Sequence, residues 1–217
     1  MNDEKPSRPR IAGYGEDSLT LWALKYRLPQ ILGALGDQSS HNRCDVLYRP
    51  GFGRKGGDGS AEFGEFDYLI MSPTRLYLGE SKWNRSGEVR RGVFTIRPEQ
   101  EVRHALFRQY VTDWFKFHNA SGHGTICSWN QFVDWAPSSF KVLGKTKRIA
   151  PRGSQTSKSL FTVLERTWNY YRGRCPEIVD VITYFYDQRV HSLPDNRTGF
   201  EFVPVQYDET QGGYVDL

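Results

Sequence analysis

Cysteine is scarce in this chain of 217 residues, and the three that occur, Cys44, Cys127 and Cys175, lie far apart. An odd number of cysteines without a CxxC pair predicts neither a disulfide framework nor a zinc ribbon, so we expect reduced, structural thiols. Long apolar runs are also missing, because a membrane span needs roughly 18 consecutive apolar residues and no stretch approaches that length. These absences argue against secreted disulfide scaffolds and membrane-embedded proteins.

The chain also lacks a strong excess of either charge. Its net charge is +4, and 38% of its residues are hydrophobic and 25% charged, which is typical of a globular protein with a real core. The N-terminus is charged rather than apolar, so no signal peptide is predicted and a cytoplasmic location is expected. We expect residues 1–13 to form a flexible segment and 14–217 a single domain, with a core over 14–120 and a C-terminal extension over 121–217.

Apolar periodicity predicts a mixed α/β fold. Leu19, Trp22, Ala23 and Tyr26 recur at helical spacing, which indicates a buried helix that breaks or kinks at Pro29. Further helices are predicted over 99–118, opened by Pro98, and over 160–171. Strands are predicted over 44–48, 62–71, 75–83, 178–186 and 200–207. The glycine-rich segment 50–60 and the basic segment 141–158 are expected to be loops.

The strand-like runs on either side of residues 72–74 form a predicted hairpin. Ser, Pro and Thr at these positions favour a tight turn, and that turn decides which residues oppose each other. Asp67 then faces Glu80. Because side chains alternate between the faces of a strand, Asp67, Glu80 and Lys82 share one face.

Opposed carboxylates inside apolar runs are costly unless another charge compensates them. Asp67, Glu80 and the backbone carbonyl of Ser81 are hard oxygen ligands that suit Mg²⁺, and Mn²⁺ is expected to substitute. Lys82 can orient a water or share the charge of an oxyanion. These are the parts that phosphodiester hydrolysis needs. The alternative is a surface hairpin in which Glu65 pairs with Lys82.

The stretch GEFDYLIMSPTRLYLGESKW, residues 64–83, resembles the core hairpin of the PD-(D/E)xK nuclease superfamily, which includes restriction endonucleases and Holliday-junction resolvases. Asp67 matches the first acid of that family and Glu80, Ser81 and Lys82 its Glu-x-Lys triad, although Ser81 stands where an apolar residue is common. The resemblance implies a restriction-endonuclease-like central mixed sheet flanked by helices, and a Mg²⁺-dependent endonuclease with DNA favoured over RNA. It is specific over about 20 residues, weaker over 16–117, and absent from the C-terminal half.

The resemblance also suggests two supporting residues. Glu16 resembles a helical acid that lies ahead of the hairpin and supports metal binding, with Asp17 as a rival. Gln109 resembles a polar residue that faces the site from the helix after the triad. Lone polar residues on helices are often solvated or capping, so Gln109 has that second interpretation.

Two groups of basic residues are expected to contact nucleic acid. One group follows the triad closely, and the other lies in segment 141–158, which contains no acidic residue. The predicted contacts are Arg85, Arg90 and Arg91 in the first group and Lys145, Lys147 and Arg148 in the second. A solvated basic loop is the alternative interpretation. No membrane partner is expected, and cutting both strands with one site per chain would favour a homodimer.

Other motifs and function classes compete with this interpretation. Three glycines in segment 51–56 satisfy GxGxxG, but no helix-forming run follows, so a loop is favoured over a phosphate cradle. His118, His123 and Cys127 have no evident fourth ligand, so zinc is not predicted. A catalytically inactive nucleic-acid-binding module on the same fold is the main alternative. An interaction protein in which the carboxylates are incidental is the third.

Overall fold

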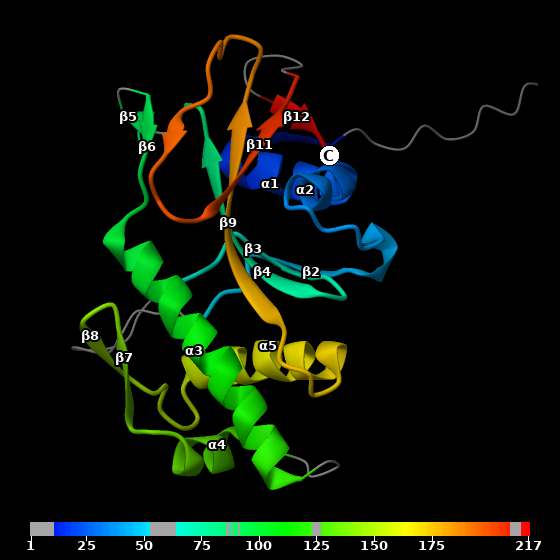
Figure 1. The fold of residues 1–217 in the computed structure, drawn as a ribbon. Helices are drawn as coiled ribbons and strands as arrows, with labels where there is room; N and C mark the ends of the chain where they lie inside the picture. The colour runs from blue at the N-terminus through cyan, green and yellow to red at the C-terminus, as the bar shows by residue number, and fades with distance from the viewer. Residues whose placement is uncertain are drawn as a thin grey trace, which may run out of the picture.

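The computed structural model describes residues 11–52, 64–85, 87, 89–90, 92–122, 127–208 and 214–217. These residues form a mixed α/β fold with five α-helices and a central sheet of five strands in the order β11-β9-β4-β3-β2 (Figure 1). The predicted fold class is confirmed. None of the helices in these ranges is long and apolar enough to cross a membrane.

The helices are α1 (Gly15–Tyr26), α2 (Leu28–Ala34), α3 (Pro98–Ser121), α4 (Trp129–Trp135) and α5 (Gln155–Tyr171), with a 3₁₀ turn at His41–Arg43. The strands of the central sheet are β2 (Asp45–Tyr48), β3 (Tyr68–Met71), β4 (Arg75–Trp83), β9 (Glu177–Tyr186) and β11 (Glu201–Gln206). Three smaller sheets are made by β1 (Ala12–Tyr14) with β12 (Tyr214–Asp216), by β5 (Val89–Arg90), β6 (Val93–Phe94) and β10 (Asp195–Asn196), and by β7 (Ser139–Val142) with β8 (Lys145–Arg148).

The β3–β4 hairpin has the register predicted from its turn. Tyr68 pairs with Gly79, and Met71 pairs with Leu76, as expected for a turn at residues 72–74. The pairing with β4 ends at Tyr68, so the first strand is shorter than its apolar run suggested. β4 continues beyond this point because its other edge pairs in parallel with β9 along its whole length.

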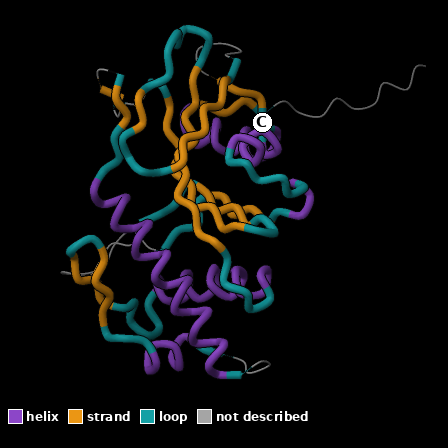
Figure 2. The backbone as a smooth tube through the Cα atoms, in the orientation of Figure 1, coloured by secondary structure: helices purple, strands orange, loops and turns teal. Residues whose placement is uncertain are grey.

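Helices cover both faces of the central sheet, as Figures 1 and 2 show. On one face, α3, α4 and α5 pack on a core that includes Leu69 and Leu78. On the other face, α1 and α2 pack on a core that includes Ile70 and Tyr77. Both faces of β3 and β4 are therefore buried, which explains why their sequences are apolar at consecutive positions. Two of the five strands come from beyond residue 120, so the sheet crosses the division expected there between a core and an extension.

A glycine in the middle of β4 allows a close approach between the two strands of the hairpin. A Cβ at Gly79 would lie 2.0 Å from the ring of Tyr68, its partner across the strands. Tyr68 crosses this position to reach Thr183 on β9, with 2.6 Å between the two hydroxyl oxygens. The contact locks three strands together directly beside Asp67.

One predicted loop was wrong, and the helix after it begins earlier than predicted. Segment 141–158 is not a loop, because residues 139–148 form the β7–β8 hairpin and α5 begins at Gln155. The hairpin is held by Phe140 and Val142, which are buried in the core beside α3. The break predicted at Pro29 is confirmed: α1 ends at Tyr26, and Pro29 lies in the first turn of a second helix, α2, where the missing N–H of proline loses no hydrogen bond.

The structure describes only the end of the N-terminal segment that was predicted to be flexible. Residues 1–10 lie outside the described residues, whereas Ala12–Tyr14 form β1 and pair with β12. Residues 53–63, which include most of the glycine-rich segment 50–60, also lie outside them. Its start is anchored, since Phe52 is fully buried and donates its N–H to the carbonyl of Gly64.

Candidate active site

Asp67 lies at the point where β3 separates from β4. Its N–H donates to the carbonyl of Gly79 at 3.2 Å, and its carboxylate Oδ2 accepts the N–H of Ser81 at 2.7 Å. β3 no longer provides a backbone carbonyl for the N–H of Ser81, and the Asp67 carboxylate accepts this N–H instead. This arrangement places Asp67 against Glu80, as the hairpin register predicted.

Asp67 is close enough to Glu80 for their charges to interact. Burial raises the pKa of the Asp67 carboxyl, the negative charge of Glu80 raises it further, and the result is about 6 despite the Ser81 hydrogen bond and the nearby Lys82 and Arg103. The usual value is 3.8. The described residues thus leave the ionised form of Asp67 incompletely compensated.

Glu80 is only 2% exposed and is held by the first turns of α3. Gln100 Nε2 donates to Oε2, Arg103 Nη2 donates to Oε1, and His104 Nε2 lies 3.1 Å from Oε1. Burial raises the pKa of the Glu80 carboxyl, but the His104 hydrogen bond and the positive charges of Arg103, His104 and Lys82 outweigh it and lower the pKa. Glu80 is therefore ionised over the physiological range.

A chain of charged side chains extends from the buried Glu80 and His104 to the half-buried Asp180. The other ring nitrogen of His104, Nδ1, lies 2.9 Å from Asp180 Oδ1 on β9, and Asp180 also accepts a hydrogen bond from Arg108. Burial lowers the pKa of His104, but its bonds to Asp180 and Glu80 outweigh this and raise it. His104, between the carboxylates of Glu80 and Asp180, connects the candidate site to α3 and β9.

Lys82 lies on the same face of β4 as Glu80, as predicted from strand alternation. Its Nζ is 3.9 Å from Glu80 Oε2, and the residue is only 5% exposed. Glu65, which the surface-hairpin alternative pairs with Lys82, accepts a hydrogen bond from Arg49 Nε at 2.7 Å. A buried ammonium thus faces the two carboxylates.

Glu16, at the start of α1, reaches the same edge of β4. Its Oε2 accepts the N–H of Trp83 at 3.0 Å. Ser81 and Trp83 are two positions apart, so their N–H groups leave the same strand edge about 6.6 Å apart. Asp67 and Glu16 therefore cap successive N–H groups of the edge that β3 leaves open. The rival Asp17 instead pairs with Arg49.

The helix after the triad contributes different residues from the one predicted. Gln109 donates to Asp113 one turn along α3 at 2.7 Å, whereas Gln100 contacts Glu80. Gln100, Arg103 and His104 were not predicted from the sequence. The signal that could have found them is a polar start to the buried stripe of α3, since positions three and four apart share one helix face.

A charged residue inside an apolar strand was also missed. Asp180 interrupts the apolar sequence of β9 just before its buried residues 181–185, and a half-buried charge of this kind is costly unless it is paired. Its partners are His104 and Arg108.

The basic residues predicted to contact nucleic acid are only partly described. Arg85 Cζ lies 5.1 Å from the ring centre of Trp83, and Arg85 Nη2 is 3.7 Å from Asp187 Oδ2. Arg90 is in β5, and Arg91 lies outside the described residues. Lys145, Lys147 and Arg148 are on β8, where the first and last are exposed.

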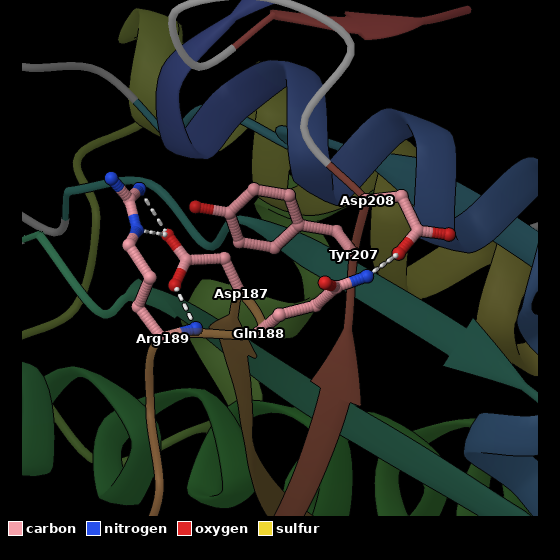
Figure 3. A pocket seen from close by; sticks show the side chains of 5 residues that line it. All are labelled: Asp187, Gln188, Arg189, Tyr207 and Asp208. Atoms are coloured by element: carbon pink, nitrogen blue, oxygen red, sulfur yellow. Dashed lines mark hydrogen bonds and ion pairs between the residues drawn. The ribbon is translucent and has the colours of Figure 1, made fainter.

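A cavity of about 250 Å³ opens near the end of β4, but its lining contains none of the candidate site residues. Figure 3 shows its lining side chains, which come from the carboxyl ends of β9 and β11 and the residues that follow. Arg189 binds Asp187 there, and Gln188 donates to Asp208. The hydrogen bond from Arg189 holds the pKa of Asp187 at about 2, so the charge of Asp187 is compensated within the cavity.

The oxygen donors of the site fit Mg²⁺ by their chemistry. Asp67 receives one hydrogen bond from the described residues, and the three donors to Glu80 leave one of about four lone-pair positions on its carboxylate. The geometry is less favourable, since no cluster of three or more His, Cys, Asp or Glu within the described ranges is arranged to hold a metal ion.

Comparisons with protein-family models, with curated proteins and with solved structures gave no match to this chain.

Proposed function

We propose that this protein is a metal-dependent nuclease that hydrolyses phosphodiester bonds, with DNA as the favoured substrate. The observation that carries the proposal is the position of Asp67 beside Glu80 at the open edge of β4, where the Asp67 carboxylate accepts the N–H of Ser81 and where burial and the negative charge of Glu80 raise the pKa of Asp67 to about 6. Two ionised carboxylates in this position repel each other, and a divalent cation is the natural compensation. The likeness to the PD-(D/E)xK hairpin is part of this proposal.

The side chains have distinct roles in the proposed reaction. Asp67, Glu80 and the Ser81 carbonyl would hold Mg²⁺, which supplies a water of lowered pKa and neutralises charge on the phosphoryl group. Glu16 caps Trp83 N–H and provides a further carboxylate at the same strand edge. Lys82 orients the attacking water or shares the charge that develops on the phosphate oxygens.

Arg103 offers a further contact for a phosphate. Its Nη2 binds Glu80, while its Nε is buried and has no hydrogen-bond partner among the described residues. A buried donor of this kind is normally satisfied by water or a ligand oxygen. Its position beside Glu80 therefore supports a phosphate-bearing substrate.

A catalytically inactive nucleic-acid-binding module is the second candidate. It is favoured by the pairing of Glu80 with Arg103 and His104, because these cations already neutralise a carboxylate that the nuclease proposal assigns to the metal. A calorimetric titration separates the two candidates. The nuclease requires Mg²⁺ or Mn²⁺ binding that is lost in Asp67→Asn, whereas the inactive module requires none.

The direct test is a cleavage assay on linear duplex, single-stranded and branched DNA and on RNA, with Mg²⁺, Mn²⁺ and EDTA arms. Cleavage is expected only with a divalent cation. Lys82→Met should abolish turnover with little effect on Mn²⁺ affinity, because it removes the group beside the water but no ligand. Lys116→Met, at an exposed lysine of α3, is the matched control. Full activity in Lys82→Met would overturn the assignment, and paired cuts in both strands would support a homodimer.

A further inference from the structure

The β7–β8 hairpin combines positive charge with an apolar tip. Its strands, 139–142 and 145–148, contain four basic residues and no acidic one, and Lys141, Lys145 and Arg148 are exposed. The tip residue, Leu143, is 62% exposed, more than any other large apolar side chain in the described residues.

The backbone at the tip makes leucine an unfavourable choice. Val142 pairs with Lys145, so Leu143 and Gly144 form a two-residue loop, and their φ angles are +45° and +73°. Two positive φ values are typical of a type I′ turn, in which asparagine is strongly preferred at the first position. A leucine at that position has both an unfavourable conformation and an exposed apolar surface. Such an exception suggests a function for the side chain.

The hairpin is anchored close to the candidate site. Tyr110 of α3 accepts the N–H of Ala150 at 2.9 Å, and its ring centre lies 4.9 Å from that of Phe140. Ten residues of the same helix separate Tyr110 from Gln100, which binds Glu80, and this corresponds to about 15 Å. One turn of duplex DNA spans about 34 Å, so a single duplex can contact both places.

We propose that the β7–β8 hairpin binds duplex nucleic acid by its backbone and inserts Leu143 as a wedge between neighbouring base pairs. The proposal rests on the nuclease function and names its substrate class as a duplex that is locally unstacked. Lysine and arginine on the strands match the charge of the phosphates, and leucine is among the side chains that proteins insert between base steps. Opening a step costs free energy, so an already mismatched step should be preferred.

The decisive variant is Leu143→Asn, because asparagine suits the turn and removes the wedge without removing charge. Binding to a short duplex is measured in EDTA across a range of salt concentrations, with and without a central mismatch. Leu143→Asn should bind the matched duplex about tenfold more weakly at every salt concentration, with the same slope of log affinity against log salt and no preference for the mismatch. Its melting temperature should equal or exceed that of the wild type.

Two further variants serve as controls. Leu143→Met keeps an apolar tip and should retain the wild-type affinity and mismatch preference. Leu193→Asn changes another exposed leucine, 45% exposed, and should have no effect. Wild-type behaviour of Leu143→Asn would overturn the wedge, as would binding of the wild type to anionic vesicles but not to a duplex.

The same preparations separate this inference from the proposed nuclease. If the wild type cleaves DNA and Leu143→Asn binds the duplex as the wild type does, the wedge proposal is wrong and the nuclease proposal stands. Leu143-dependent duplex binding without cleavage under any metal would retain the wedge and remove the catalytic proposal.

Discussion

An aspartate lies at each end of the β3–β4 hairpin, and the two have different surroundings: Asp37 is buried and Asp67 is half-buried. At the turn end, Asp37 is 7% exposed and accepts from Ser72 Oγ at 2.6 Å, Tyr77 Oη at 2.8 Å and the Ser39 N–H at 2.8 Å. At the open end, Asp67 has one hydrogen bond from the described residues and faces another carboxylate.

The difference appears in their acidity. Burial raises the pKa of Asp37, but the hydrogen bonds from Ser39, Ser72 and Tyr77 outweigh it and hold the pKa well below its usual range. Burial and Glu80 raise the pKa of Asp67 to about 6. The neutral donors around Asp37 let its carboxylate stabilise the turn. Burial and a like charge make the ionised form of the second carboxylate, Asp67, unfavourable, which is the basis for proposing it as a ligand of a cation.

The largest expected effect is on cleavage at the open end. Asp67→Asn should lower turnover by roughly a hundredfold to a thousandfold, because it removes a proposed metal ligand. The same variant should raise the free energy of unfolding by about 1–2 kcal/mol, since the cost of burying a charge and the repulsion with Glu80 both disappear. Kinetics and urea denaturation measure the two effects. Asp45→Asn, at the turn end of β2, is the control, and unchanged cleavage in Asp67→Asn would contradict the proposed site.

The next effect is on stability at the turn end. Asp37→Ala should lower the free energy of unfolding by about 2–4 kcal/mol, because it leaves the hydroxyls of Ser72 and Tyr77 buried without their acceptor. Turnover at a temperature where the variant stays folded should be close to that of the wild type. Asp195→Ala removes an exposed acid paired with Arg197 and should cost less than about 1 kcal/mol. An equal loss of unfolding free energy in Asp37→Ala and Asp195→Ala would mean that Asp37 does not stabilise the turn.

The stability contributions of Asp67 and Asp37 should change with pH in opposite directions. The pKa of Asp67 is raised by folding, so between 3.8 and about 6 unfolding releases a proton and the stability contribution of Asp67 falls as pH rises. The pKa of Asp37 is lowered, so its contribution is present above its usual pKa and is lost as pH falls. Denaturation from pH 3 to 8 of wild type, Asp67→Asn and Asp37→Asn tests this. The advantage of Asp67→Asn should vanish below about pH 4.

The smallest expected effect is on nucleic-acid affinity. Replacing Lys145, Lys147 and Arg148 with glutamine should weaken binding similarly for unrelated sequences, because interactions with the phosphate backbone carry no base information. The slope of log affinity against log salt should flatten by about 0.9 for each duplex phosphate that the variant no longer neutralises. Turnover at saturating substrate should survive. An unchanged slope would identify β8 as an ordinary solvated strand.

The sequence alone determined the hairpin and its register. A short polar turn between two apolar runs leaves few ways to pair them, and strand alternation then places Glu80 and Lys82 together. The same local logic identified most helices and strands of the central fold. It failed at 141–158, because the basic residues of β8 give no apolar pattern typical of a strand. β8 pairs with β7, and β7 buries Phe140 and Val142 against α3.

Only the tertiary structure decided what surrounds Glu80. Which face of α3 meets β4 depends on how the whole helix packs, and both Gln100 and Gln109 satisfy a polar position on that helix. The pairing of His104 with Asp180 joins residues 76 positions apart. Local sequence patterns carry information about neighbours within a turn or a hairpin, whereas the charges that tune a buried carboxylate come from distant segments brought together by the packed core.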